Sequence, residues 1–158
     1  MKNIQILILL FCISSCSNKE VKKEKKIAWN MIEISTRKHK VIIYKDLDTA
    51  SYEKEIWKLI SKRAFLGTYK LDKVEHKSFS ITKLERDSLH SYVSKMFTNP
   101  TFSDRSCTDY VGKVKISMGN NGSFLSCEYN SVCEWTSVSP ETQKIYDLLK
   151  NKVDISTK

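Results

Sequence analysis

Hydrophobic and polar residues follow one another along this chain in blocks of different length and period. The first block is an almost unbroken apolar run, Ile4–Ile13, with Lys2 before it and Ser14, Ser15 and Cys16 after it. A run of this length is too short to cross a bilayer as a helix. Its positive start and small-residue end are typical of a secretory signal. We therefore expect residues 1–15 to be a signal peptide.

A charged block separates this run from the rest of the chain. Residues 19–26 hold five Lys and two Glu and show no hydrophobic period. We interpret residues 16–26 as a tether and residues 27–158 as a single folded domain. The 143 residues that follow the signal peptide are enough for one hydrophobic core and too few for two comfortable ones.

The first part of the body reads as a hairpin followed by a helix. Residues 27–35 and 40–45 alternate as two strands, and His39 is expected to be exposed at the tip between them. A helix is then expected to begin at Asp48 or Thr49 and to end before Gly67. Its predicted core stripe has helical spacing and consists of Tyr52, Ile56, Leu59 and Ile60.

The second part begins with mixed strand signals over residues 69–81, where His76 is expected to be solvated. Thr82 and Glu85 then form a capping box for a helix that ends near Pro100. His90 falls beside the apolar stripe of that helix, where a structural role is expected.

A second hairpin is the clearest element of the body. Its predicted strands, 110–118 and 123–129, flank the turn Gly119-Asn120-Asn121-Gly122, since Asn and Gly tolerate positive φ. This register places Ile116 opposite Leu125. A last helix is expected to be capped by Ser139, with Pro140 at its first position and Trp135 packed beneath it.

These elements predict an α+β fold. We expect an antiparallel sheet with about three helices packed against it, in the order β-β-α-β-α-β-β-α.

The residues Ile13-Ser14-Ser15-Cys16 resemble the lipobox of bacterial lipoproteins. The resemblance implies cleavage before Cys16, a diacylglyceryl thioether on its sulfur and a further acyl chain, such as palmitate, on its new amino group. It also implies a cell-envelope protein anchored to the inner or outer membrane, with its body in the periplasm or at the cell surface. The alternative is an ordinary signal peptide with Cys16 as an incidental small residue.

The cysteines of an exported body are candidates for disulfides. Once Cys12 leaves with the signal and Cys16 is acylated, three of the five remain. The hairpin register brings Cys107 close to Cys133, so this pair leads, with Cys127 as a possible free thiol. A Cys127–Cys133 bridge is the rival pairing.

The sequence contains no catalytic constellation that we can identify, and we expect no metal and no cofactor. Cys127 and Cys133 lack the spacing of a zinc or redox motif, and no His lies within thirty residues of either. A cysteine nucleophile paired with His90 or His76 has no local support. A possible partner-binding loop comprises Ser131, Val132, Glu134 and Trp135.

The net charge of +9 comes mainly from the first half of the chain. Through Phe79 there are 17 Lys or Arg and 9 acids, and beyond it 10 and 9. Lys outnumbers Arg 23 to 4, and aromatic residues are not interleaved with the basic run. Both features argue against nucleic acid as a partner. Anionic lipids are a better candidate than nucleic acid for the partner of the lysines in the tether.

Three functions therefore stay open. The first is a non-catalytic, membrane-anchored envelope lipoprotein that acts as a binding or structural module towards another envelope protein or a small ligand. The second is an envelope hydrolase using Cys127 or an acidic loop. The third is an inhibitor or immunity-type protein.

Overall fold

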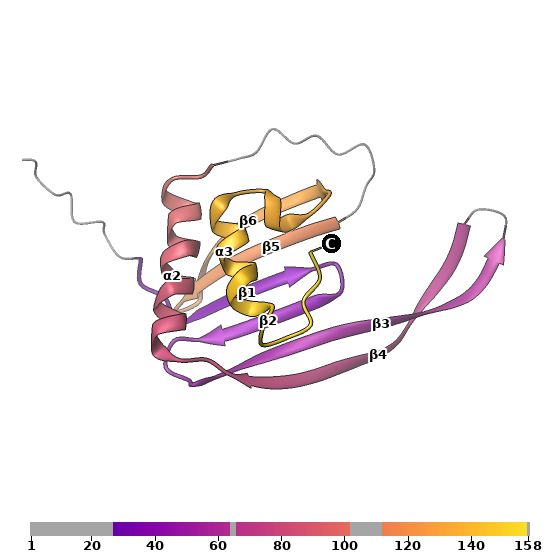
Figure 1. The fold of residues 1–158 in the computed structure, drawn as a ribbon, viewed down its shortest axis with the longest axis horizontal. Helices are drawn as coiled ribbons and strands as arrows, with labels where there is room; N and C mark the ends of the chain where they lie inside the picture. Colours follow the sequence, from indigo (N-terminus) through magenta and orange to yellow (C-terminus); the bar gives the residue numbers. More distant parts are fainter. Residues whose placement is uncertain (1–26, 64–65, 102–111, 158) are drawn as a thin grey trace, which may run out of the picture.

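The computed structural model describes residues 27–63, 66–101 and 112–157. Six antiparallel strands form one sheet in the order β4-β3-β2-β1-β5-β6, and the helices lie on one face of it (Figure 1). The elements are β1 (Met31–Thr36), β2 (His39–Tyr44), β3 (Thr49–Arg63), β4 (Leu66–Ser80), α2 (Lys83–Thr98), β5 (Gly112–Asn120), β6 (Ser123–Val132), the 3₁₀ helix η1 (Trp135–Ser137) and α3 (Pro140–Leu149).

The predicted fold class is wrong in its helix content and its element order. The described residues form mostly sheet, with two α-helices instead of about three. Four strands precede the first of these helices, whereas the sequence pattern favoured a helix between the second and third strands.

The helix expected from Thr49 onward is strand β3, which pairs along its whole length with β4. The pairing of β3 with β4 contains two irregularities. The register shifts between Ile56 and Trp57 and again between Leu59 and Ser61. The first irregularity leaves Asp72 of β4 unpaired and the second leaves Ile60 of β3 unpaired, so the alternation of β3 is unbroken from Tyr52 to Leu59. The helix-like spacing arises because Tyr52 and Ile56 project from one face of β3 and Leu59 from the other.

The β5–β6 hairpin is present, but its predicted register is wrong by two residues. Ile116 lies opposite Cys127 rather than Leu125. The turn contains two residues instead of four, Asn121 at φ 47° and Gly122 at φ 83°. Two consecutive residues with positive φ make the tight turn that matches the twist of a hairpin.

Both described α-helices begin as predicted. Thr82 and Glu85 form the capping box of α2, and Ser139 caps α3 together with Thr142. The apolar stripes of the two helices pack on the sheet in one cluster, whose fully buried members are Ile32, Ile34, Val41, Ile43, Leu89, Val93, Val114, Ile116, Ile145 and Leu149.

The C-terminal strap, residues 153–157, crosses the helix-bearing side and fastens distant elements. The backbone N–H of Ser156 donates to Nδ1 of His39 at 3.1 Å, and Tyr52 donates its hydroxyl to the carbonyl of Asp154 at 2.6 Å. Trp135 donates its indole N–H to the carbonyl of Ser156 at 2.7 Å. His39 is therefore buried, which corrects the expectation of an exposed hairpin tip.

Candidate functional site

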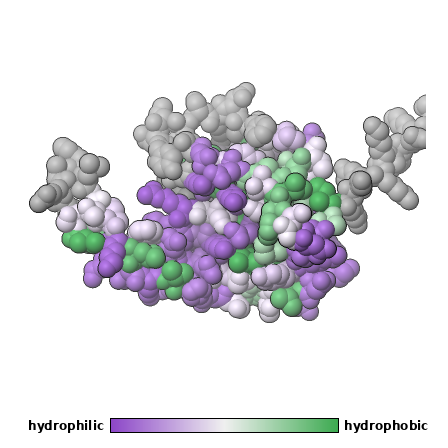
Figure 2. All heavy atoms as spheres, turned by 180° about the vertical axis from the view of Figure 1, so that it is seen from behind, coloured by the Kyte–Doolittle hydropathy of each residue, from purple (hydrophilic) through white to green (hydrophobic). Residues whose placement is uncertain are grey.

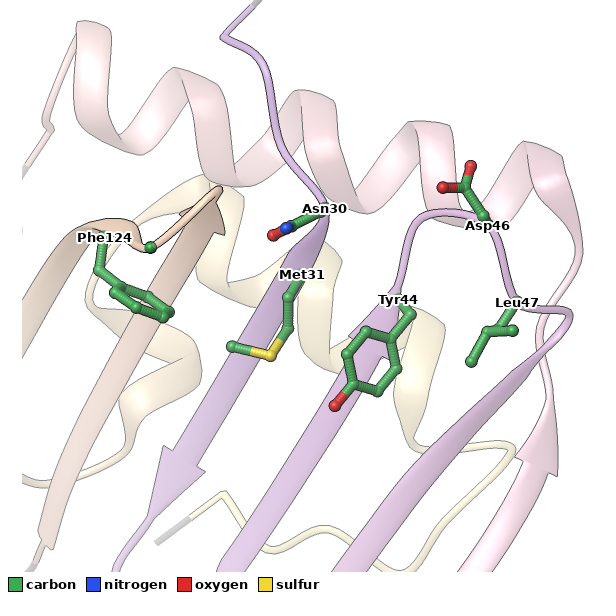
Figure 3. A pocket seen from close by; sticks show the side chains of 7 residues that line it. Asn30, Met31, Tyr44, Asp46, Leu47 and Phe124 are labelled. Carbon is green, nitrogen blue, oxygen red and sulfur yellow. The ribbon is translucent and has the colours of Figure 1, made fainter.

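Large apolar side chains are exposed at two places on the described surface. We call the first the apolar shelf; it consists of Met31, Tyr44, Leu47 and Phe124 (Figure 3). The second is the ribbon, the part of the β3–β4 hairpin that extends beyond β2, over residues 56–63 and 66–73 (Figure 1).

The strand register builds the apolar shelf. Met31 of β1 lies opposite Tyr44 on one side and Gly119 on the other, and Gly119 lies opposite Phe124. These residues form one row across four strands. Their neighbours along the strands point to the helices, so this row points to the opposite face, which no helix of the described part covers.

Gly119 leaves a hollow in that row. A Cβ atom there would lie 2.7 Å from Cε1 of Phe124, so the absence of a side chain lets the phenyl ring lie over the strand. Phe124 is still 62% exposed and Leu47 50% exposed. The shelf borders a hollow of about 380 Å³, and the carboxylate of Asp46 points away from it (Figure 3).

Arg86 holds Leu47 in place. Its side chain is buried, and Nη1 donates to the carbonyls of Leu47 at 2.6 Å and Ile81 at 2.9 Å and to Oδ1 of Asp48 at 2.7 Å. The loop after β2 is thereby fastened to the start of α2. Nothing in the sequence pattern marks Arg86, because its partners lie up to 39 residues away.

The described chain begins next to the shelf. Ile27, Ala28, Phe124 and Leu125 share an adjoining hollow of about 420 Å³. The carbonyl of Ile27 lies 2.8 Å from Nε2 of His90. His90 also stacks on the buried ring of Trp29 at a centroid distance of 5.3 Å. The predicted structural role of His90 is therefore confirmed: it fixes the start of the body to α2.

The ribbon has two unlike faces. Trp57 pairs with Leu71 and Leu59 pairs with Tyr69, so these four residues share one face. All four are exposed, Tyr69 by 60%. Between these two rows Lys58 pairs with Lys70, so both lysines project from the other face.

A basic–aromatic pocket lies where the ribbon leaves the sheet. It is lined by Arg37, Lys38, Trp57 and Tyr69 and has a volume of about 420 Å³. The backbone N–H of Glu55 donates to the carbonyl of Lys38 at 2.8 Å, which holds the β1–β2 turn against β3. Neither Arg37 nor Lys38 has an ion pair with an acid of the described residues, although Glu55 lines the adjoining hollow.

The predicted thiols lie away from both surfaces. Cys127 carries a free thiol and is half-buried on β6. Burial raises the pKa of this thiol above its ordinary value, although a hydrogen bond with Tyr129 opposes the effect. A raised pKa keeps the sulfur protonated and disfavours it as a nucleophile. Cys133 is not free; its predicted partner Cys107 lies outside the described residues, so that pairing stays a prediction.

The predicted partner-binding loop is divided by the fold. Val132 ends β6 and Glu134 is exposed, but Trp135 is only 1% exposed and packs edge-on against Tyr146 of α3. Trp135 therefore packs beneath the last helix, as predicted, and its ring is not available to a partner. The side chain of Ser131 is not described. Cys16 lies outside the described residues, and its lipidation stays a prediction.

The residues of the shelf and the ribbon were missed in the sequence for different reasons. The ribbon was hidden by the helix predicted over residues 49–66. The shelf left a partial signal, because alternation that turns Leu125 inward turns Phe124 outward, but only the fold shows that Met31, Tyr44 and Leu47 lie near it.

The described residues contain no metal-binding cluster and no helix suited to cross a membrane. No three His, Cys, Asp or Glu side chains come together there as a metal centre would require. Among the helices of the same residues, none has both the length and the apolar character needed to cross a bilayer. Comparison with protein-family models, curated proteins and solved structures gave no match.

Proposed function

We propose that this chain is a membrane-anchored envelope lipoprotein whose body is a non-catalytic binding module, and that the ribbon binds another envelope protein. The observation that carries the proposal is the exposure of Trp57, Leu59, Tyr69 and Leu71 on an arm that projects beyond the rest of the sheet (Figure 1). A two-stranded hairpin is marginal by itself in water. A partner that covers its apolar face would stabilise it.

The composition of the ribbon supports a protein partner. Trp, Tyr and Arg are the residues that most often dominate protein–protein binding energy, and Trp57, Tyr69 and Arg37 meet in the basic–aromatic pocket. The cations Arg37 and Lys38 are available to acids of a partner. We therefore expect the partner surface to combine an apolar groove with acidic side chains at its margin.

The proposed location in the cell envelope rests on the lipobox-like residues Ile13-Ser14-Ser15-Cys16. Two or more acyl chains on Cys16 would hold the protein stably on an inner or outer bacterial membrane, with the body in the periplasm or at the cell surface. Replacing Cys16 by Ala tests this part alone. The mature protein should lose the mass of its acyl chains and leave the membrane fraction; an unchanged mass and location would contradict the anchor.

Site-specific photo-cross-linking in the native cells tests the binding role. A photoreactive residue at Leu71, on the apolar face of the ribbon, should give one discrete adduct. Changing Trp57 and Tyr69 together to Ser should remove that adduct while the protein stays anchored. An adduct partner that is an enzyme inhibited by the body would assign the inhibitor-type function.

A second leucine supplies the control. Leu84 on α2 is 77% exposed and lies outside the ribbon. The same photoreactive residue at this position should give no adduct of that mass. Identical adducts from positions 71 and 84, or an adduct that persists in the double serine variant, would show that the ribbon is not the binding surface.

A further inference from the structure

We propose that the apolar shelf is the surface on which the anchored body rests against a bilayer containing anionic lipids. This inference depends on the proposed lipidation of Cys16, but it concerns a different surface from the ribbon. It assigns the exposed apolar side chains at the start of the body to the membrane itself.

The length of the tether places the shelf near the bilayer. Ten residues, 17–26, separate Cys16 from Ile27. Even when fully extended they span only about 35 Å, at roughly 3.3–3.6 Å per residue. Ile27 and Phe124 line the same hollow, so Phe124 has almost the same reach limit. The ribbon lies at the far end of the body from this point (Figure 1).

The fold also fixes where the tether leaves the body. Nε2 of His90 lies 2.8 Å from the carbonyl of Ile27, and Trp29 is buried beneath the His90 ring. The N–H of Asn30 donates to the carbonyl of Gly119 at 2.8 Å. The start of the body is thus attached to both α2 and β5, and the shelf cannot turn away from it.

The chemistry of the shelf suits a lipid–water interface. Hydrophobic residues gather at this end of the uncovered face, on the right of Figure 2, whereas most of the remaining face is hydrophilic. Tyrosine and other aromatic rings favour the headgroup region of a bilayer. Leu47 and Phe124 would bury apolar surface there, while Asp46 points away from the shelf (Figure 3).

Charge complementarity favours anionic lipids as the occupant. The tether carries Lys22, Lys23, Lys25 and Lys26 directly before the body, and the exposed Lys45 follows Tyr44 at the margin of the shelf. Lysines close to an anionic membrane surface are each attracted to it. The ribbon lies at the end of the body remote from the tether, so contact of the shelf with the membrane would leave it able to reach a partner (Figure 1).

Tyr44 and Tyr69 provide a matched pair for the test. Tyr44 of the shelf is 43% exposed and Tyr69 of the ribbon is 60% exposed, so hydroxyl radicals should oxidise them at similar rates in the free body. The full lipidated protein is reconstituted in phosphatidylcholine vesicles containing phosphatidylglycerol and oxidised briefly. We expect Tyr44 to react several-fold more slowly than Tyr69.

Two variants test whether the apolar side chains of the shelf cause the protection of Tyr44. Changing Leu47 and Phe124 together to Ser should return the Tyr44-to-Tyr69 ratio to that of the protein in dilute mild detergent. Ile60→Ser removes an equally exposed apolar residue of the ribbon and should leave Tyr44 protected. Equal oxidation of the two tyrosines in vesicle-bound wild-type protein would overturn the proposal.

Two further outcomes also decide against it. Protection of Tyr44 in the absence of vesicles that grows with protein concentration would assign the shelf to a second copy of the chain. The mass of the same sample reports the lipid on Cys16. If the protein is lipidated but its shelf is unprotected, only the contact between the shelf and the bilayer is refuted. If the protein carries no lipid, the proposed anchor is refuted as well.

Discussion

At the scale of single residues, His39 shows how the fold sets the charge of a side chain. Burial lowers its pKa below the ordinary value for histidine, and the nearby charge of Lys54 adds to this, while Asp154 opposes it. Its Nδ1 accepts the hydrogen bond from Ser156, so this nitrogen carries no proton. The neutral ring is therefore the form that holds the C-terminal strap.

We predict that His39 makes the protein less stable in mild acid. Because the pKa is lower in the folded state, the unfolded chain binds the proton first, and stability falls as the pH drops below about 6.5, the ordinary histidine value. Urea unfolding should show a lower midpoint at pH 5.5 than at pH 7.5. His39→Gln, whose side-chain oxygen can accept the Ser156 N–H, should reduce that difference; an unchanged difference would contradict the assignment.

The burial of His39 could not be predicted from its neighbours in the sequence. Thr36-Arg37-Lys38 is a polar turn, and a histidine after it is normally exposed. The residue that covers it, Ser156, is 117 positions away. Arg86 was missed for the same reason. Local pattern correctly predicted the caps at Thr82 and Ser139, because a cap depends on residues three positions apart, but the cap expected at Asp48 or Thr49 precedes a strand.

At the scale of elements, the ribbon shows where the period of hydrophobic residues fails to predict secondary structure. A strand reveals itself by alternation when one face is buried, as in β5, where Val114, Ile116 and Met118 are inward. The ribbon has no described layer packed on it, so its sequence is not constrained to alternate between apolar and polar residues. The helical spacing of Tyr52, Ile56 and Leu59 was therefore accidental.

A second element-scale feature joins the two helices. Nζ of Lys95 on α2 lies 3.0 Å from Oε1 of Glu141 in the first turn of α3, and the Glu141 side chain is only 4% exposed. Burial alone would raise the pKa of Glu141, but the hydrogen bonds from Lys95 and from the helix backbone hold it below its ordinary value. The ionised carboxylate also suits the positive end of the α3 dipole.

We predict that Lys95→Met lowers the free energy of unfolding by about 1–3 kcal/mol, because it leaves a buried carboxylate without its cation. Glu141→Gln in the Lys95→Met background should recover part of that loss. Chemical denaturation of the wild type, both single variants and the double variant measures the coupling. Strictly additive effects would show that the pair contributes nothing beyond its separate groups.

At the scale of the whole molecule, we predict that a Cys107–Cys133 disulfide joins the chain before β5 to the chain after β6. Digestion without reduction should release these two cysteines in one linked peptide, with Cys127 recovered as a thiol. Its raised pKa should make Cys127 slow to alkylate in the folded protein. Reduction should lower the free energy of unfolding by about 2–4 kcal/mol. A linked peptide that contains Cys127 would refute the pairing.

The two proposed binding surfaces lie at opposite ends of the molecule. The apolar shelf lies beside the start of the body, and the ribbon projects at the other end (Figure 1). Chain order alone did not reveal this arrangement, because the shelf draws on β1, the loop after β2 and the β5–β6 turn.

The C-terminal strap has a consequence for biogenesis. Residues 154–157 supply the hydrogen-bond partners of Tyr52, Trp135 and His39, groups that would otherwise be left unpaired in the interior. A polypeptide that has been synthesised only as far as Val153 cannot pair these groups, so the core closes only after residues 154–157 have been added.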